Sequence, residues 1–126
     1  IGFVLPCYNE FDNIFILIRQ IKKIFKDYFI IIIDDSSTDE IKKKIKSYKK
    51  IKYYKRKTKS GRGSAVLFGM SQILKNKNVD VIVEMDTDLS SHPKELKKNL
   101  EYFKNEKIDL LVMSRYMTGS KIINWP

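Results

Sequence analysis

The feature that most constrains the fold is the alternation of short apolar runs with longer amphipathic segments. The apolar runs are rich in Ile, Val and Phe, as β-strands are. They predict five strands, at residues 1–5, 29–33, 51–54, 79–85 and 108–113. This alternation is typical of an α/β protein in which helices cover both faces of a mainly parallel sheet.

The segments between the runs predict helices. Apolar residues recur at helical spacing as Phe11, Ile14, Phe15, Ile18, Ile21 and Phe25, then as Val66, Leu67, Met70, Ile73 and Leu74, and then as Leu96, Leu100 and Phe103. A shorter helix is expected after Glu40, because Ser37 and Glu40 stand at capping-box spacing. Pro93 suits the first turn of the last helix, where its missing N–H has no cost.

Chain length indicates one domain. A chain of 126 residues, 43% of them hydrophobic, is long enough for one core and too short for two. Residues 1–126 are therefore expected to form one domain. Because the sequence starts at Ile1 without a methionine and stops at Pro126 in a Gly-, Asn- and Pro-bearing segment, we expect this domain to be part of a longer protein, incomplete at its C-terminus.

The formal net charge of +10 raises the question of nucleic-acid binding. Nearly all the basic residues are lysines, and they are spread over predicted helix faces and segment ends such as residues 41–46. They do not form an arginine-rich arm with interleaved aromatic residues. The distribution favours a solvated surface, with an attraction to anionic membranes or phosphates as the alternative.

Cysteine content and the length of the apolar runs bear on the cellular setting. Cys7 is the one cysteine, which excludes an internal disulfide framework and a cysteine-based zinc cluster, and a reducing, cytosolic setting fits best. We expect Cys7 to be a small packing residue. No run approaches the roughly 18 to 20 apolar residues that cross a bilayer, and the N-terminus lacks the layout of a signal peptide. Any membrane contact is expected to be peripheral or to lie outside this sequence.

Polar and glycine-bearing motifs follow every predicted strand. They are PCYNE at residues 6–10, DDSS at 34–37, KSGRG at 59–63, DTD at 86–88 and SRY at 114–116. Doubly wound sheets bind ligands beyond the carboxyl ends of their strands, so these five loops are expected to converge on one edge. Scattered surface polarity would not be phased with the strands in this way.

The DTD motif is a candidate metal site. Asp86 and Asp88 place two carboxylates two residues apart where an apolar strand ends, so both can approach one divalent cation. Hard oxygen ligands at low count suit Mg²⁺ or Mn²⁺, which share coordination with substrate phosphates and neutralise a departing diphosphate. The alternative is a solvated strand end. Glu84 lies on the same side of the strand as Asp86 and suits a structural salt bridge as well as a role in the site.

The DDSS motif and Tyr8 are candidates for nucleotide binding. One carboxylate of Asp34 and Asp35 is expected close to the ligand, where it can accept hydrogen bonds from a base or a ribose hydroxyl. The other is expected to face the start of a helix or solvent, and helix capping alone is the alternative interpretation. Tyr8 can stack on a base, although tyrosines at strand ends also serve as rim packing.

The KSGRG motif is suited to phosphate binding. Gly61 and Gly63 allow a close approach of the backbone to a ligand. Lys59 and Arg62 offer positive charge to a diphosphate. A single Gly-x-Gly is weak support for such a site, so the argument depends on its position among the other motifs.

Together these motifs resemble those of family-2 glycosyltransferases with the GT-A fold. The matching segments, in chain order, are PCYNE at 6–10, IIDDSSTD at 32–39, GRGSA at 61–65, EMDTDLS at 84–90, SRY at 114–116 and NWP at 124–126. The last two are similar specifically to the dolichol-phosphate and bacterial polyprenyl-phosphate mannosyltransferases within that family. The resemblance covers essentially the whole chain in the right order, which makes it more specific than any one motif.

The resemblance implies a Rossmann-like GT-A domain over residues 1–126 that binds a nucleotide sugar, typically GDP-mannose, with UDP-glucose used by close relatives. With the residue-based expectations above, the expected nucleotide-sugar site consists of Pro6, Tyr8, Glu10, Asp35, Gly61, Arg62 and Asp86. The expected ligands of Mg²⁺ or Mn²⁺ are Asp86, Asp88 and Ser90, the last standing where the family often has Gln. In the family the chain continues beyond the NWP motif.

The resemblance also implies a reaction. Polyprenyl phosphate in a membrane would attack the anomeric carbon with inversion, with Asp88 and Arg115 as the expected catalytic residues and the protein at the cytoplasmic face. A sugar hydroxyl needs a general base, whereas a phosphate monoester, with a second pKa of about 6, is largely ionised at neutral pH. The family commonly has His where this chain has Ser91, one place before His92, and we expect His92 to lie at the solvent-facing start of a helix without a catalytic role.

Other function classes match parts of the pattern. A family-2 transferase with a saccharide acceptor shares the first four motifs, but it is not expected to have SRY followed by NWP. A non-enzymatic receiver domain also has acidic residues at its strand ends, but it needs a lysine where this chain has Ser114 and Arg115. A nucleic-acid-binding domain would show steep salt-dependent retention on DNA. The end of the chain favours the lipid-phosphate acceptor.

Overall fold

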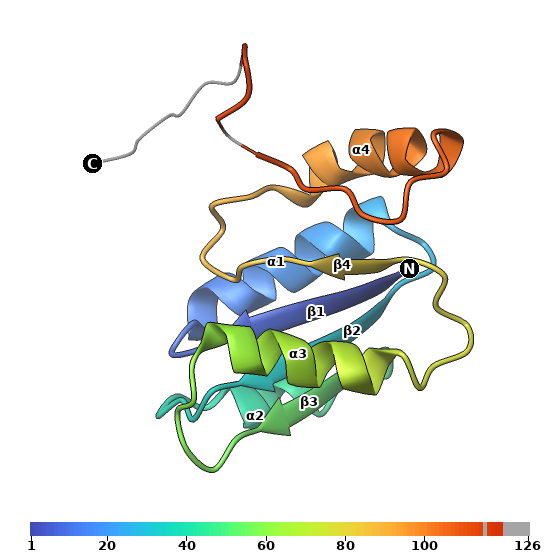
Figure 1. Ribbon diagram of the computed structural model, residues 1–126. Coiled ribbons are helices and arrows are strands. Elements are labelled where there is room, and N and C mark those ends of the chain that lie inside the picture. The colour runs from blue at the N-terminus through green and yellow to red at the C-terminus, as the bar shows by residue number, and fades with distance from the viewer. Residues whose placement is uncertain (115, 120–126) are drawn as a thin grey trace.

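The structure, a computed structural model, describes residues 1–114 and 116–119. The elements are β1 (Gly2–Cys7), α1 (Phe11–Ile24), β2 (Phe29–Asp34), α2 (Ile41–Ile45), β3 (Ile51–Lys55), α3 (Arg62–Ile73), β4 (Ile82–Glu84) and α4 (Pro93–Asn105). The strands form one parallel sheet in the order β3-β2-β1-β4. Helix α3 covers one face, and α1 and α2 cover the other, with α4 against α1 (Figure 1). The predicted α/β, doubly wound fold is confirmed.

The register of the sheet brings the strand ends to one edge. Strand β1 pairs with β2 from Gly2 opposite Phe29 to Cys7 opposite Asp34. The ladder continues past the strands, because the backbone N–H of Asp35 donates to the Cys7 carbonyl (2.9 Å) and that of Arg56 to the Asp34 carbonyl (2.8 Å). The loops after all four strands therefore leave from the same side of the sheet.

Two hydrophobic cores lie on the two faces of the sheet. Phe3 and Leu5 of β1 pack towards α1, and Val4 between them packs on the opposite face with Ala65 and Ile73 of α3. This is the period of two that a strand dictates. Because both faces are covered, the strands can be apolar throughout, as the run of isoleucines in β2 is.

Helix α3 contacts the sheet mainly through small residues, and the expected apolar face was only partly right, since Ile73 is buried and Met70 packs against the same core. The fully buried residues of α3 are Ala65, Gly69 and Ile73, whereas Leu67 and Leu74 are exposed. A Cβ atom at Gly69 would lie 2.4 Å from Cγ1 of Val4, so the backbone of α3 approaches β1 more closely than a larger side chain would permit. Apolar periodicity does not register a packing face made of small residues.

The start of α2 also differs from the expectation. No side chain caps this helix, and its N-cap is Glu40. The hydroxyl of Ser37 instead accepts a hydrogen bond from the backbone N–H of Asn9 (2.9 Å), so the predicted capping box is wrong because a tertiary contact occupies the capping group.

The expectation for the start of α4 is confirmed. Pro93 is its first residue, and the exposed His92 is its N-cap, with Nδ1 accepting from the Lys94 N–H (3.0 Å).

The fifth predicted strand is wrong as well. Residues 108–113 form no strand, and in the part of the chain that the structure describes they make no backbone hydrogen bond to the sheet. A strand needs a partner ladder, and the neighbouring β4 has only three residues, Ile82–Glu84, where the sequence predicted seven. The sulfur of Met113 instead accepts a hydrogen bond from the side-chain amide of Asn99 in α4 (2.9 Å). Within residues 1–114 and 116–119, no helix has the length and apolar character to cross a membrane.

Candidate active site

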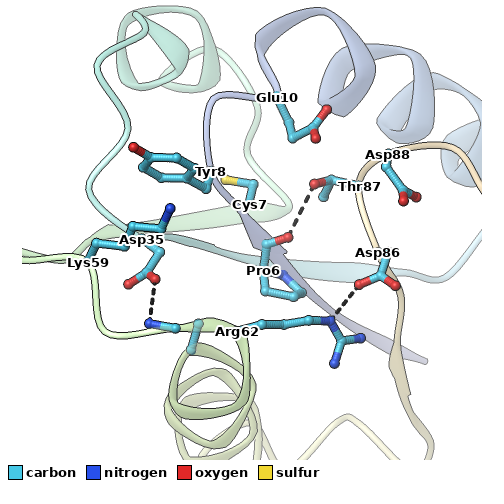
Figure 2. A pocket seen from close by; sticks show the side chains of 12 residues that line it. Pro6, Cys7, Tyr8, Glu10, Asp35, Lys59, Arg62, Asp86, Thr87 and Asp88 are labelled. Carbon is cyan, nitrogen blue, oxygen red and sulfur yellow. Dashed lines mark hydrogen bonds and ion pairs between the residues drawn. The ribbon is translucent and has the colours of Figure 1, made fainter.

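A cleft of about 270 Å³ opens at the carboxyl edge of the sheet (Figure 2). Eight of the residues predicted for the site line it, namely Pro6, Tyr8, Glu10, Asp35, Gly61, Arg62, Asp86 and Asp88. They come from the end of β1, from the loops after the four strands and from the start of α3. The cleft is also lined by Lys59, which the sequence suggested for a diphosphate, and by three residues without a predicted binding role, Cys7, Ala65 and Thr87. The convergence expected from the sequence is thus found for the first four loops.

Asp35 organises the loop between β3 and α3. Its carboxylate accepts the backbone N–H of Ser60 (3.0 Å) and of Gly61 (2.8 Å) and pairs with Nη1 of Arg56 (3.1 Å). Asp35 is only 5% exposed, so these donors replace the water that the charged group has lost. Gly61 has φ of 87° and ψ of 157°, a conformation that is essentially restricted to glycine. Asp35 therefore fixes the backbone from which Arg62 extends.

Asp34 is fully buried and bonds elsewhere. Oδ1 accepts the backbone N–H of Ser37 (2.7 Å), at the approach to α2, and Oδ2 accepts the hydroxyl of Tyr53. Burial, together with the hydrogen bond to Asp34, raises the pKa of Tyr53, so the phenol remains a donor. The expectation that one aspartate lies at the cleft while the other faces the start of a helix is confirmed, with Asp35 at the cleft.

Asn9 joins the first two loops, a role that the sequence analysis missed. Its backbone N–H donates to the Ser37 hydroxyl, and its Oδ1 accepts the backbone N–H of Thr38 (2.9 Å). Asn9 has a positive φ of 56°, a conformation that asparagine tolerates better than most residues. The available signal was its position between Tyr8 and Glu10. Asn9 thereby holds both of these cleft residues in place.

Tyr8 and Lys59 form the rim of the cleft next to Asp35 (Figure 2). The ammonium group of Lys59 lies 3.7 Å from the centroid of the Tyr8 ring, a cation–π contact. Tyr8 is 41% exposed, so its aromatic surface is accessible at the rim. The pair presents a flat ring beside a positive charge, which is a combination suited to a base with a nearby phosphate.

Arg62 crosses the cleft to the end of β4. Its Nε donates to Oδ1 of Asp86 (2.7 Å), and its Nη2 pairs with Oε1 of Glu84. The hydrogen bond to Asp86 raises the pKa of Arg62, and the charges of Glu84 and Asp88 act in the same direction. Burial raises the pKa of Glu84, and the positive charge of Arg62 opposes that effect. Of the two interpretations of Glu84, the structure shows the salt bridge.

Asp86 and Asp88 are the candidate metal ligands. Thr87, between them, turns into the protein and donates to the Pro6 carbonyl (3.2 Å), which holds this loop against β1. Oδ1 of Asp88 accepts the Ser90 N–H (2.9 Å), and Ser90 does not line the cleft. No group of three His, Cys, Asp or Glu side chains gathers within residues 1–114 and 116–119. Two exposed carboxylates fit Mg²⁺ or Mn²⁺ that takes its other ligands from phosphate and water.

The remaining predicted residues lie outside the cleft or outside the described residues. Arg115 and the NWP motif at 124–126 are not among the described residues, and Ser114 and Tyr116 do not line the cleft. Cys7 lines it from within the core. Burial, and then the charge of Asp34, raise the pKa of the Cys7 thiol, and the expectation of a packing residue is confirmed.

Over nearly its whole length the chain is similar to three curated proteins. It is 34% identical to the dolichol-phosphate mannosyltransferase of Pyrococcus furiosus, over 100% of this chain and 36% of that protein. It is 29% identical to the undecaprenyl-phosphate mannosyltransferase of Micrococcus luteus (98% and 51%) and 30% identical to the polyprenol monophosphomannose synthase of Mycolicibacterium smegmatis (98% and 48%). The chain thus spans between about a third and half of these relatives.

Solved structures with the same fold include TarS of S. aureus, residues 1–349. The complex of TarS with UDP matches with a TM-score of 0.74 at 20% identity, over 97% of this chain and 37% of that chain. The complex with UDP-GlcNAc matches with a TM-score of 0.72 at 21% identity, over 97% and 36%. At this level of identity the likeness establishes the fold, and it confirms the predicted GT-A architecture.

A model of one protein family covers nearly the entire chain. It is described as glycosyl transferase family 2 and matches residues 3–126. The match contains every motif on which the resemblance was based. The strand order, the cleft at the carboxyl edge and the three relatives agree with it. The chain therefore belongs to glycosyl transferase family 2.

Proposed function

We propose that this chain is the nucleotide-sugar-binding part of an enzyme that transfers mannose from GDP-mannose to a polyprenyl phosphate, with inversion and with Mg²⁺ or Mn²⁺. The observation that carries the proposal is that Asp86 and Asp88 face one cleft with Tyr8 and Asp35. The relatives support the choice of acceptor, since two are named as mannosyltransferases of dolichol phosphate and undecaprenyl phosphate. One domain, residues 1–126, provides the donor site.

The donor nucleotide is assigned to the side of the cleft formed by β1 and β2. The base stacks on Tyr8, and the ribose hydroxyls donate to Glu10 and Asp35. Asp35 already accepts two backbone N–H groups, so its main contribution is to hold the loop that carries Gly61 and Arg62. Pro6 closes the floor between the two sides. UDP-glucose is the alternative donor.

The diphosphate is assigned to the side formed by β4 and α3. Asp86 and Asp88 hold the divalent cation, with Ser90 as a further ligand. When bound, the cation stabilises the charge that develops on the leaving diphosphate. Arg62 starts α3 beside the cleft, where its guanidinium can reach phosphate oxygens. Arg115, which lies outside the described residues, is assigned to the acceptor phosphate.

The choice of a phosphate acceptor is supported by the ionisation of phosphate at neutral pH. His92, the one histidine of the chain, lies at the exposed start of α4 and does not line the cleft. The described cleft thus contains no imidazole to act as a general base, and an ionised phosphate monoester needs none. A polyprenyl acceptor places the active protein peripherally at the cytoplasmic face of a membrane, with no nucleic-acid partner.

The donor half of the proposal is tested by calorimetric titration of the chain with GDP and with UDP, each with and without Mn²⁺. We expect GDP to bind more tightly than UDP and to depend on Mn²⁺. In Asp88→Ala the affinity should fall at least about 10-fold, the smallest loss seen when groups that merely orient a metal ligand are removed. Asp80→Ala, which removes an exposed aspartate at the amino end of β4, is the matched control and should bind normally.

The acceptor half is tested on the full-length protein with GDP-mannose. We expect mannose to appear on polyprenyl phosphate and not on a saccharide. Transfer of mannose to a saccharide only would be compatible with the donor site but would show that the proposed polyprenyl-phosphate acceptor is wrong. If the folded chain bound neither GDP nor UDP, the assignment of the cleft as a donor site on this chain would be wrong.

A further inference from the structure

The guanidinium of Arg62 lies against one of the two carboxylates of the proposed metal site. Its Nε donates to Oδ1 of Asp86 (2.7 Å), and its Nη2 is paired with Glu84. Figure 2 shows the Arg62 side chain extended across the floor of the cleft to Asp86. One of the two carboxylates assigned to the divalent cation is thus already engaged by a positive group of the chain itself. Asp88 pairs with no basic side chain among residues 1–114 and 116–119, and its Oδ1 accepts the Ser90 N–H.

The backbone of Arg62 is fixed, whereas its side chain is free to leave. Ser60 and Gly61, which precede it, are held by Asp35 on the opposite side of the cleft. The Arg62 side chain is 55% exposed, so it is not locked by packing. Rotation about side-chain bonds can therefore move the guanidinium away from Asp86 without any change in the fold.

Glu84 explains why the guanidinium rests on Asp86. An exposed ion pair between Arg62 and Asp86 alone would contribute little, because solvent screens it and ordering two side chains is unfavourable. Glu84 binds the second nitrogen and is less exposed than Asp86 (28% against 44%). Two residues apart on the strand, the two carboxylates lie on the same side and accept the two nitrogens together. Glu84 thereby aligns Arg62 on Asp86.

From this geometry we propose that Arg62 is a stand-in cation. While the donor is absent it holds Asp86 and weakens the binding of a free divalent cation. When a nucleoside diphosphate enters, the guanidinium transfers to the phosphates and releases Asp86 to the metal. The inference rests on the proposed metal site at Asp86 and Asp88. It assigns Glu84 as a positioning residue for Arg62 and not as a metal ligand.

The physical basis is competition between two positive groups for one carboxylate. A divalent cation and the guanidinium cannot both lie against Asp86 without repelling each other. A diphosphate removes the conflict, because it offers the guanidinium a planar, bidentate anionic partner. Metal and nucleotide are therefore coupled through Arg62, in addition to any direct bond between cation and phosphate. By linkage, each then increases the affinity for the other by the same factor.

The experiment measures Mn²⁺ affinity by the electron paramagnetic resonance of free Mn²⁺, with and without GDP. Arg62→Gln should bind Mn²⁺ alone about fivefold or more tightly than the wild type, the lower end of typical coupling between sites. GDP should then raise the Mn²⁺ affinity of Arg62→Gln by a smaller factor than it does in the wild type. Circular dichroism and the unfolding transition check that the variants are folded.

Two further variants separate competition from a general change of charge. Lys59→Gln also removes one positive charge from the cleft, but Lys59 lies on the Tyr8 ring and contacts no carboxylate among the described residues. Its effect on Mn²⁺ affinity should be clearly smaller than that of Arg62→Gln. Glu84→Gln should tighten Mn²⁺ binding, because Arg62 loses its anchor, although one negative charge is lost.

The outcomes distinguish this inference from the proposed function. If Arg62→Gln bound Mn²⁺ no more tightly than the wild type and Lys59→Gln do, the stand-in role would be overturned while the metal site remained. The same would follow if Glu84→Gln bound Mn²⁺ more weakly than the wild type does. Both the metal site and the inference would be wrong if neither the wild type nor Arg62→Gln bound Mn²⁺ in the presence of GDP. They would also both be wrong if Asp88→Ala left the Mn²⁺ affinity unchanged.

Discussion

Two pairs of aspartates follow two strands of the same sheet, and the structure uses them in opposite ways. Asp34 and Asp35, at the end of β2, are 0% and 5% exposed, and they accept hydrogen bonds from donors in α2's approach, β3 and the loop before α3. Asp86 and Asp88 follow β4 and are accessible in the cleft. Their partners are the exposed Arg62 side chain, which bonds to Asp86, and the local Ser90 N–H, which bonds to Asp88.

The difference shows that a carboxylate at a strand end can either build a cleft or remain open to a ligand. A buried carboxylate must satisfy its lone pairs within the protein, since leaving them unpaired is costly. Asp34 and Asp35 do so, and as a result they hold the loop before α2 and the loop before α3. Asp86 and Asp88 retain lone pairs that water or a cation can use. The first pair should therefore govern stability and the second pair ligand binding.

The largest contrast is expected between Asp34→Ala and Asp88→Ala. Loss of Asp34 leaves the Ser37 N–H and the Tyr53 hydroxyl without their acceptor in a buried network, which should lower the free energy of unfolding by about 2–4 kcal/mol. Asp88→Ala is a surface substitution and should change it by no more than about 0.5 kcal/mol. Urea denaturation measures both values. Equal losses in the two variants would break the comparison.

A second contrast lies in the loop that Asp35 holds. Gly61→Ala should destabilise the chain by about 1–3 kcal/mol, because alanine is strained at the φ and ψ of Gly61. Gly63→Ala is the matched control. It lies inside α3 with open space around the added methyl group, so it should be neutral or stabilise by up to about 1 kcal/mol. Thermal or urea unfolding should show changes in the free energy of unfolding that differ between the two variants in sign or clearly in size.

A third contrast compares Asp35→Ala with Asp86→Ala. Loss of Asp35 frees the Ser60 and Gly61 amides and should cost about 1–2 kcal/mol of stability. Hydrogen exchange at these two amides should accelerate in this variant. Asp86→Ala releases only an exposed arginine and should leave both measurements nearly unchanged. Protected amides in Asp35→Ala would show that the loop does not depend on this carboxylate.

The smallest effect is expected at alkaline pH and concerns the partner of Asp34. Burial and the hydrogen bond to Asp34 raise the pKa of Tyr53 above the unfolded value of about 10. A raised folded-state pKa contributes stability that is complete below about pH 10 and is lost as the pH rises beyond it. Unfolding free energies measured from pH 8 to 11 should therefore fall less in Tyr53→Phe than in the wild type. Parallel pH curves for the two proteins would contradict this role.

Much of the fold could be predicted because its signals are local. The first four strands were predicted from apolar runs, and α1, α3 and α4 from apolar periodicity. The start signal at residues 37–40 predicted the short α2, and Pro93 marked the start of α4 correctly. The predicted capping group, Ser37, was occupied by Asn9, which is 28 residues away in the chain. Residues 108–113 have a strand-like composition, but composition does not supply a partner ladder. Ile73 was predicted on the sheet face of α3, but Ala65 and Gly69 were missed because they have little hydrophobicity.

The site was predicted at the level of its loops and not of its internal bonds. Motifs at the strand ends identified eight residues that line the cleft. The residues that hold those loops, among them Tyr53 and Arg56, had no motif that singled them out. Each acts through one side chain that reaches a distant aspartate. Ser90 was assigned from the family resemblance, and it does not line the cleft.

The sequence by itself determined the alternation of strands and helices and the position of the acidic motifs at the strand ends, because both depend on neighbours a few residues apart. Only the tertiary structure decided which aspartates are free to bind. Asp34 has one local partner, the Ser37 N–H, but its second partner comes from β3, 19 residues away, and Gly61, which donates to Asp35, is 26 residues away in the loop after β3. Hydrogen bonding across such separations is settled by how the strands pack, and no local pattern in the sequence encodes it.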